Sequence, residues 1–332
     1  MYRSILMQKK IYLLLAILTI GLLLPANSFA QNENSTKDVG ITVSPITDEF
    51  TIKPGEVTTR VIQVVNPNDR VVTLYPHVLN FNTDNENGQP VFFSGNDESK
   101  NYTLSSWVTF SQPFVRIAKN EIQLVEVTIA APSEAEPGGH YGAVLFSTEK
   151  PSLDGDEPGK VGVVGLVGTL LLASVPGDLV EKLDIDQFGA PFITFAPPFN
   201  TSVTFKNSGN IHLKPTGEIT IKNWSGNQSG FININEGGGN VLPESRRKFD
   251  GEWRFDPLRS FGLYTLTLRA TYGGTPSEIV ATKKVLIVPV WLIIAILLLA
   301  SWIGYRIVTT LVKRKKAVIK GQFIQPQRRI LQ

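Results

Sequence analysis

The residue types that could carry chemistry are few and scattered in this chain of 332 residues. It contains three histidines, His77, His140 and His212, and no cysteine. The histidines lack the spacing of metal ligands, and without cysteine there can be no thiolate metal site or cysteine nucleophile. Neither a G-x-S-x-G elbow nor an H-E-x-x-H helix occurs. We therefore predict no catalytic, cofactor-binding or metal-binding residues, no cofactor and no enzyme activity.

His140 lies in a Gly-Gly-His-Tyr-Gly run at the start of an expected strand, and we interpret it as a structural histidine with satisfied hydrogen bonds. Gly162, Gly165 and Gly168 resemble a phosphate loop, but the spacing is not G-x-G-x-x-G. A strand-like sequence follows them, whereas a phosphate cradle needs the amide groups at a helix N-terminus. These glycines are better explained by close backbone packing or bulges.

Two acidic loops could bind Ca²⁺ weakly. The spacing in both fails the EF-hand pattern, so we interpret both as solvated loops, without excluding calcium. Their candidate ligands are Asn82, Asp84 and Glu86 before Gly88, and Asp154, Asp156 and Glu157.

Aromatic side chains could stack sugars, although packing in a core is their more common use. The sequence does not separate the two roles, and the segment 192–199, interleaved with prolines, is the strongest candidate for an exposed aromatic site. The aromatic residues in question are Trp107, Trp224, Trp253, Phe92, Phe93, Phe192, Phe195 and Phe199.

The elements that position these residues are framed by two apolar ends. At the N-terminus, Lys9 and Lys10 precede an apolar run, Ile11–Leu24, and a small-x-small site ends at Ala30. This arrangement is typical of a secretory signal, which we place at residues 1–30 with cleavage after Ala30. An uncleaved N-terminal anchor is the alternative. Residues 31–38 are expected to be a flexible lead.

The second apolar run predicts a membrane-spanning helix over residues 285–305. Its length of about 20 residues matches a bilayer core. Trp291, Trp302 and Tyr305 lie along it or near its ends, as interfacial aromatics do. The tail, residues 306–332, is basic, which predicts a cytoplasmic location. We therefore expect a single-pass protein with its N-terminal domains outside the cell.

The charge distribution agrees with this topology. The two ends hold 11 basic residues and no acidic ones, so the middle carries 21 of the 32 basic and all 29 acidic residues, a net charge of −8. The overall charge of +3 thus comes from the membrane-flanking ends, and we predict no nucleic-acid partner. The lack of cysteine in an exported chain favours a bacterial surface.

The middle of the chain is a series of short β-branched runs separated by Pro, Gly, Asn and Asp turns, which predicts an all-β fold of two tandem immunoglobulin-like sandwiches. We place them at residues 39–178 and 179–284. The expected strands are Ile41–Val43, Val57–Val65, Val71–Phe81, Ser106–Phe110, Phe114–Ala118, Ile122–Ala130, His140–Thr148 and Val161–Val175, then Leu183–Phe188, Ser202–Lys206, Thr216–Lys222, Phe231–Ile234, Arg246–Trp253, Tyr264–Tyr272 and Glu278–Val288.

Several short motifs resemble those of the WxL-interacting proteins of Gram-positive cell surfaces. They are Ile41–Pro45, Lys53–Glu56, Val64–Asn66, Asn87-Gly88 and Tyr141–Phe146 in the first domain and Asn207–Gly217 in the second. The resemblance implies that the first domain binds peptidoglycan and WxL-domain proteins and that the second binds host factors. The first domain also resembles the N-terminal domain of periplasmic pilus chaperones, but no equivalent of their paired basic anchoring residues is apparent in the sequence.

Our leading hypothesis is a non-catalytic, membrane-anchored adaptor or adhesion protein that engages the cell wall or other surface proteins through a strand edge or sheet face. The alternative is a chaperone-like assembly factor for exported proteins. A hydrolase or an enzyme accessory protein is a third option, for which the sequence offers no acid–base constellation.

Overall fold

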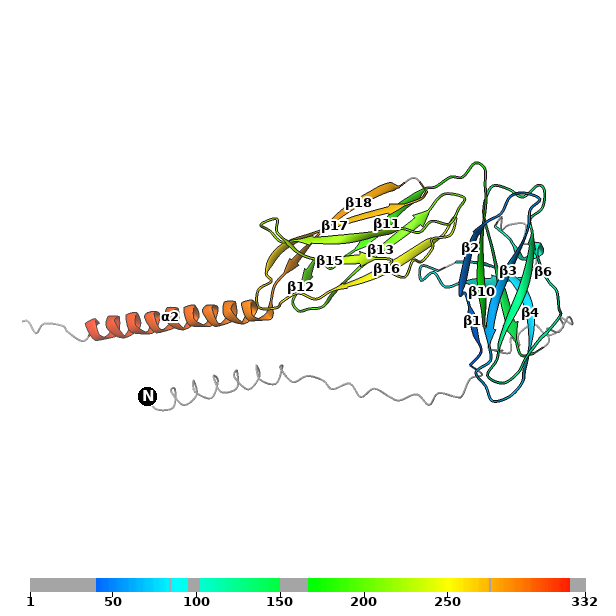
Figure 1. Cartoon of the computed structure of the whole chain (residues 1–332). Helices are drawn as coiled ribbons and strands as arrows, with labels where there is room; N and C mark the ends of the chain where they lie inside the picture. Colours follow the sequence, from blue (N-terminus) through cyan, green and yellow to red (C-terminus); the bar gives the residue numbers. More distant parts are fainter. Residues whose placement is uncertain (1–39, 84, 95–101, 150–166, 275, 323–332) are drawn as a thin grey trace, which may run out of the picture. The chain divides into compact units, whose positions relative to one another are not determined.

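The computed structural model describes residues 40–83, 85–94, 102–149, 167–274 and 276–322 (Figure 1). The signal peptide, the flexible lead and several candidate ligands, Asp84, Asp154, Asp156, Glu157, Gly162 and Gly165, therefore lie outside the described residues. Within the described ranges the chain forms strands β1 to β18, one 3₁₀ turn and one C-terminal α-helix, which confirms the all-β prediction.

The first sandwich contains two sheets that enclose one core. One sheet has the order β1-β3-β8-β6, and the other has the order β2-β10-β9-β4-β5, with β7 also paired to β4. Their bounds are β1 Thr42–Ser44, β2 Thr47–Thr51, β3 Val57–Val65, β4 Val72–Asn82, β5 Val91–Phe93, β6 Val108–Phe110, β7 Val115–Ile117, β8 Ile122–Ala130, β9 Gly138–Ser147 and β10 Val167–Val175.

The period-2 pattern of these strands explains the core between the sheets. In β8, Val125, Val127 and Ile129 point inward and are buried, whereas Ile122 and Leu124 are exposed. Strand β9 is buried along its whole length because it lies between β10 and β4. Gly168 on β10 permits close packing there, since an added Cβ would collide with the carbonyl oxygen of Val144. The interpretation of Gly168 as a close-packing glycine is confirmed.

The second sandwich has the sheet orders β11-β13-β16 and β12-β18-β17-β14-β15. Phe205, Trp253 and Leu268 belong to its buried core. Its strands are β11 Leu183–Gly189, β12 Ile193–Thr194, β13 Phe199–Asn207, β14 Thr216–Lys222, β15 Gln228–Ile234, β16 Arg246–Trp253, β17 Gly262–Tyr272 and β18 Ser277–Ile287.

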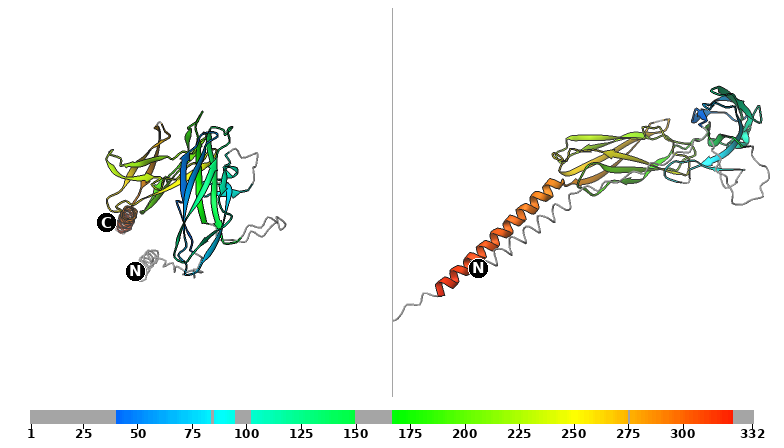
Figure 2. Two further views of the ribbon diagram at one scale, coloured as in Figure 1. Left: turned by 45° about the vertical axis from the view of Figure 1, so that its right-hand side comes forward. Right: turned by 90° about the horizontal axis from the view of Figure 1, so that it is seen from below.

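The helix α2 runs from Val290 to Gln322 without interruption (Figure 2). It begins later than the 285 predicted for the membrane span, because β18 continues to Ile287. Val285 and Ile287 alternate into the core of the second sandwich and are fully buried, and composition alone does not distinguish such a strand from the start of an apolar helix. The stretch Val290–Arg314 is long and apolar enough to cross a membrane.

Candidate functional site

The three histidines do not form a common site. His77 lies on β4, while the ring nitrogens of buried His140 lie 3.1 Å from the Thr103 carbonyl oxygen and 3.0 Å from that of Glu136. His140 thus has the hydrogen-bonded structural environment expected of it. Among the described residues, no group of three His, Asp or Glu side chains could hold a metal ion.

The loop that follows β4 is not a freely solvated one. The carbonyl oxygen of Glu86 accepts a hydrogen bond of 2.6 Å from the amide of Lys248, on β16 of the second sandwich. Gly88 faces the Arg247 guanidinium, whose carbon would lie 2.5 Å from an added Cβ. The part of this loop around Glu86 and Gly88 is thus a docking element between the sandwiches, for which the sequence contains no local signal.

The aromatic residues divide into two classes. Trp107, Trp253 and Phe199 are buried in the cores, whereas Phe192, Phe195 and Trp224 are exposed by 79%, 46% and 70%. These three exposed residues lie in loops of the second sandwich, so the segment 192–199 does present aromatic side chains to its surroundings. Phe92, on β5 of the first sandwich, is exposed by 37%.

The first sandwich has an open strand edge at β8. All nine residues of β8 pair with β3 on one side, but on the other side β6 pairs only with Val127–Ile129. The half of the strand from Ile122 to Glu126 therefore has no partner strand on this side among the described residues. An unpaired edge is a template for another extended chain.

The hydrogen-bond pattern shows which backbone groups this edge presents. The amides of Asn66 and Ala131 donate to the carbonyls of Glu121 and Glu56, so odd-numbered residues of β8 bond to β3. The even-numbered residues, Ile122, Leu124 and Glu126, consequently turn their N–H and C=O groups toward the open side. The Gln123 side-chain amide donates to the carbonyl oxygen of Leu124 at 3.1 Å, in the position of a missing partner strand.

A groove runs beside this edge. After Phe110 the chain leaves β8 and leads to β7, which opens a hollow of about 230 Å³ between Phe110–Gln112 and Gln123–Glu126. Val115 and Val125 contribute to its lining. The groove leaves room for a backbone to approach the open side of β8.

The outer face of the same sheet is apolar. Ile122 and Leu124 on β8 and Val57 and Val61 on β3 are each exposed by 50% to 63%. In the antiparallel register Leu124 lies opposite Gln63, and Val61 is two residues before Gln63 on the same strand. Because alternate side chains point to the same side of a sheet, Val61 and Leu124 share one face. We name the open half of β8, Ile122–Glu126, and this face the β8 edge site.

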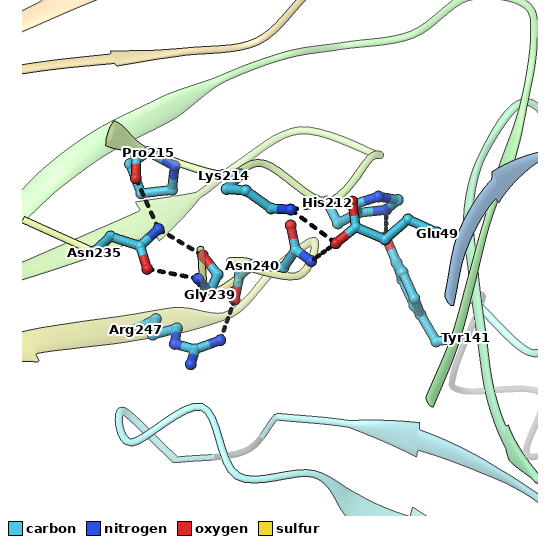
Figure 3. Close-up of polar contacts among 9 residues, drawn as sticks. All are labelled: Glu49, Tyr141, His212, Lys214, Pro215, Asn235, Gly239, Asn240 and Arg247. Atoms are coloured by element: carbon cyan, nitrogen blue, oxygen red, sulfur yellow. Dashed lines mark hydrogen bonds and ion pairs between the residues drawn. The ribbon is translucent and has the colours of Figure 1, made fainter. Parts of the chain in front are cut away.

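A second polar region lies where the two sandwiches meet, in a cleft of about 390 Å³. Glu49 on β2 accepts hydrogen bonds from Lys214, at 3.0 Å, and from Asn240, at 2.7 Å (Figure 3). The Tyr141 hydroxyl lies 3.3 Å from Nδ1 of His212. Leu242 of the second sandwich packs against residues of the first, so the junction has an apolar part as well.

Arg247 is the unusual group of this cleft. Its guanidinium donates to the Asn240 carbonyl oxygen at 2.8 Å, its buried Nε has no hydrogen-bond partner, and it has no carboxylate partner among the described residues. It is held between Gly88 and Gly239, where an added Cβ would lie 2.5 and 2.6 Å from its guanidinium carbon. Burial lowers the pKa of Arg247, although a guanidinium stays charged in proteins.

The pKa values of the other cleft groups follow their surroundings. Burial lowers the pKa of His212 and raises that of Tyr141. Burial alone would raise the pKa of Glu49, but the hydrogen bonds from Asn240 and Lys214 outweigh it and lower that pKa. The cleft therefore favours neutral His212 and ionised Glu49. The basic side chains of Lys214 and Arg247 both line this cleft. Their separation in the sequence gives no indication that they lie close together.

Comparison with known proteins finds no matching family model and no matching curated protein. Among solved structures, the chain is similar to the class 5 fimbriae chaperone CfaA, with 12% identity, a TM-score of 0.38 and coverage of 74% of this chain and 99% of that one. It is also similar to the SafB chaperone with SafA pilin from Salmonella enterica (13%, 0.37, 74% and 99%). The CsuC–CsuE chaperone–tip adhesion subunit complex from Acinetobacter baumannii gives 14%, 0.35, 75% and 98%.

The predicted membership of the WxL-interacting family is wrong, as is the binding of peptidoglycan and WxL-domain proteins that it implied. The three solved structures named above are of pilus chaperones instead. Of the motifs that carried the resemblance, Lys53–Glu56 and Asn207–Gly217 contain turns with conformational causes, whereas Tyr141–Phe146 lies within strand β9. In Lys53–Glu56 the Glu56 amide bonds to the Lys53 carbonyl and Gly55 has a φ of +75°, while the Asn207 side chain bonds to the carbonyls of Ile211 and Val241. Any β-sandwich with such turns would contain similar residues.

Proposed function

We propose that this chain is a non-catalytic, membrane-anchored assembly factor for exported proteins, and that its first sandwich holds an extended segment of a client protein at the β8 edge site. The observation that carries the proposal is the open half of β8. It combines unpaired backbone groups, an adjoining groove and an exposed apolar face.

The chemistry of this edge suits strand addition. A client segment in extended conformation would exchange main-chain hydrogen bonds with Ile122, Leu124 and Glu126, and every sequence without proline offers the same backbone groups. Its alternate side chains would meet the apolar face around Val61 and Leu124. Such a site discriminates weakly between sequences, as a factor that holds several partly folded clients requires. The Gln123 side chain would be displaced when the client binds.

The proposal places both sandwiches, with an immunoglobulin-like arrangement, outside the cell and α2 in the membrane. Support comes from the apolar length of Val290–Arg314 and from the basic residues at its C-terminal end, Lys313 and Arg314. An anchored factor would meet its clients where they emerge from the membrane. A surface adaptor that uses the same edge would instead keep one folded partner permanently.

The test uses the full chain in lipid nanodiscs and a guanidinium-unfolded β-sandwich domain that aggregates on dilution. We expect the protein to slow the rise of light scattering and Leu124→Pro to abolish this effect. Proline removes an N–H that points to the open side and breaks no bond to β3, so the loss of stability should stay near 1 kcal/mol.

Leu124→Ala is the matched control, since it shortens the same side chain but retains the N–H. It should weaken the effect through the loss of one apolar contact but not abolish it. Hydrogen exchange should also show slower exchange of the Ile122, Leu124 and Glu126 amides with client present. If Leu124→Pro is fully active, or if these amides gain no protection, the β8 edge site is not the holding site. Binding of folded partners alone would favour the adaptor.

A further inference from the structure

The end of the second sandwich from which α2 emerges is surrounded by exposed apolar side chains. Phe192 and Leu258 are exposed by 79% and 73%, and Trp224 by 70%. Phe195 and Phe261, with 46% and 48%, lie in the same loops. Such a concentration of large apolar groups is unusual for a surface that faces only water.

The first of these loops is fixed beside the end of β18. Strand β12, Ile193–Thr194, runs parallel to Leu286–Ile287, close to the start of α2 (Figure 1). The amide of Leu286 donates to the Phe192 carbonyl oxygen at 2.9 Å, and that of Val288 donates to the Thr194 carbonyl oxygen at 2.9 Å. The position of Phe192 is therefore set within a few residues of the first helical turn.

Two further loops reach the same place. Trp291, in the first turn of α2, donates from its indole N–H to the Pro257 carbonyl oxygen at 3.1 Å, which fixes the loop that carries Leu258. Trp224 lies against Gly262, whose added Cβ would be 3.3 Å from the indole ring, and Gly262 pairs with Ile287. Three loops from separate parts of the chain thus gather around the residues that lead into α2.

The length of α2 fixes where a bilayer boundary would lie. From Val290 to Tyr305 the helix has about 16 uncharged residues, roughly 24 Å, before Arg306. That is slightly shorter than the hydrocarbon core of about 30 Å. If Arg306 reaches toward the headgroups and the span extends to Val312, the helix is about 34 Å long and exceeds the core by only about 4 Å. A modest tilt takes up this excess, so no apolar helix projects above the membrane. Val290 therefore marks the outer boundary of the bilayer.

We infer that the loops carrying Phe192, Phe195, Trp224, Leu258 and Phe261 are a membrane-contact surface that lies in the interfacial region of the outer leaflet. The inference rests on the membrane anchorage in the proposed function. Aromatic side chains favour this region, where one part of the ring is apolar and another is wet. Arg259, beside Leu258, has a side chain that is 90% exposed and lies 3.6 Å from the Asp256 carboxylate, and it would exchange this exposed contact for lipid phosphates.

The contact would be continuous with the helix rather than a separate docking event. Each loop is hydrogen-bonded to, or packed against, residues from Leu286 to Trp291 or their pairing partners, so inserting α2 brings the loops to the lipid without any rearrangement. The second sandwich would then be a fixed base on the membrane surface rather than a tethered domain. This assigns its exposed aromatics to lipid rather than to sugars.

The test uses the absence of cysteine from the natural sequence. Single cysteines introduced as Phe192→Cys and Leu258→Cys are labelled with an environment-sensitive fluorophore in the full chain, in phosphatidylglycerol–phosphatidylethanolamine vesicles containing lipids spin-labelled near the headgroup. The matched control is Val280→Cys. Val280 is 50% exposed on β18 itself, but seven residues before Ile287, about 23 Å along the strand. Leu298→Cys, with lipids spin-labelled deep in the acyl chain, reports the helix.

We expect the labels at 192 and 258 to be quenched at least about twofold more than the label at 280, since interfacial groups lie roughly 5–10 Å into the boundary region. Equal quenching at 258 and 280 with strong quenching at 298 would overturn the contact surface and leave the anchor intact. No quenching at 298 would remove the anchor and the inference together. A response of the label at 192 to added wall polysaccharide, without lipid quenching, would assign the loops to sugar.

Discussion

The two sandwiches differ most in how they treat the edges of their sheets. In the second, β11 carries Asp184 and Asp186 and has a register shift between Ile185 and Gln187. Its other edge strand in that sheet, β16, carries five charged residues among eight, Arg246, Arg247, Lys248, Asp250 and Glu252. Charges and bulges are the common means by which proteins prevent edge-to-edge pairing.

The first sandwich lacks these protections where they would matter most. Its open half of β8 contains a single charge, Glu126, together with exposed Ile122 and Leu124. Since the same chain protects both edges of the β11-β13-β16 sheet, an edge as open as that of β8 is not a property of all its sheets. The comparison teaches that the fold alone does not define a binding site, because the same architecture is closed or open according to a few side chains on its edge strands.

The comparison assumes that the two sandwiches fold as separate cores, and core truncation gives the largest test of it. Phe146 and Phe205 are both fully buried, one in each core. Each change to alanine should cost about 3–5 kcal/mol through lost burial and a residual cavity. Calorimetry on the full chain should show Phe146→Ala lowering one transition and Phe205→Ala the other.

The tryptophans allow the transitions to be assigned, because Trp107 lies in the first core and Trp253 in the second. If either substitution shifts both transitions by the same amount, the two sandwiches unfold as one cooperative unit. The open edge of β8 would then depend on the folding of both sandwiches and not of the first alone.

A smaller effect is expected at the junction, where Gly88 has a positive φ, and Gly226, in a turn away from the junction, is its matched control. Gly88 has a φ of +68° and faces Arg247, whereas Gly226 has a φ of +84° and no atom within 4 Å of an added Cβ. Gly226→Ala should cost about 1 kcal/mol, from the left-handed backbone alone. Gly88→Ala should cost about 1 kcal/mol more, because it also displaces a half-buried guanidinium.

Denaturant unfolding measures the two losses, and hydrogen exchange at the Lys248 amide reports the docking itself. Only Gly88→Ala should speed that exchange. If both variants lose equal stability and neither changes the exchange rate, Arg247 does not hold the sandwiches together.

Much of the fold followed from the sequence, because β-branched alternation and turn residues are local signals. The strand Ile122–Ala130 has the predicted bounds, and Val57–Val65 does as well. Short strands such as Thr47–Thr51, Val91–Phe93 and Ile193–Thr194 were missed, since two to five residues carry too little pattern to be recognised. Their pairing partners, not their composition, make them strands.

The candidate sites were harder to predict because they depend on distant pairing. The sequence places Ile122 and Leu124 on a strand, but only the early end of β6 at Phe110 leaves that strand open. Lys214 and Arg247 are far apart in the chain, and the fold brings both to one cleft, which Gly88 of the loop after β4 also lines. Resemblance to a family failed for a related reason, since turn motifs report local conformation and not function.

The smallest predicted effect is a loss of stability at the junction when the pH falls. It would distinguish the junction, which responds to pH, from the two hydrophobic cores, which do not. Burial lowers the pKa of His212 in the folded chain. The stability that neutral His212 contributes to the junction is therefore complete above the unfolded pKa of about 6.5 and is lost as the pH falls below that value. Glu49 has a lowered pKa as well, and its contribution is lost only as the pH falls below 4.5. Lys214 opposes a charge on His212, Glu49 favours it, and Tyr141 faces the ring.

Between pH 7.5 and 5.5 we therefore expect the docking to loosen through His212 alone, with the amide of Gly139, which donates to the Asn210 carbonyl oxygen, exchanging about two- to fivefold faster after correction for the intrinsic rate. The exchange of core amides, such as that of Phe205, should not change.

His212→Gln removes the titration and should make the Gly139 exchange independent of pH in this range. Persistence of the pH dependence in that variant would show that another group controls the junction, and a flat profile in the natural chain would show that the cleft does not respond to acid at all.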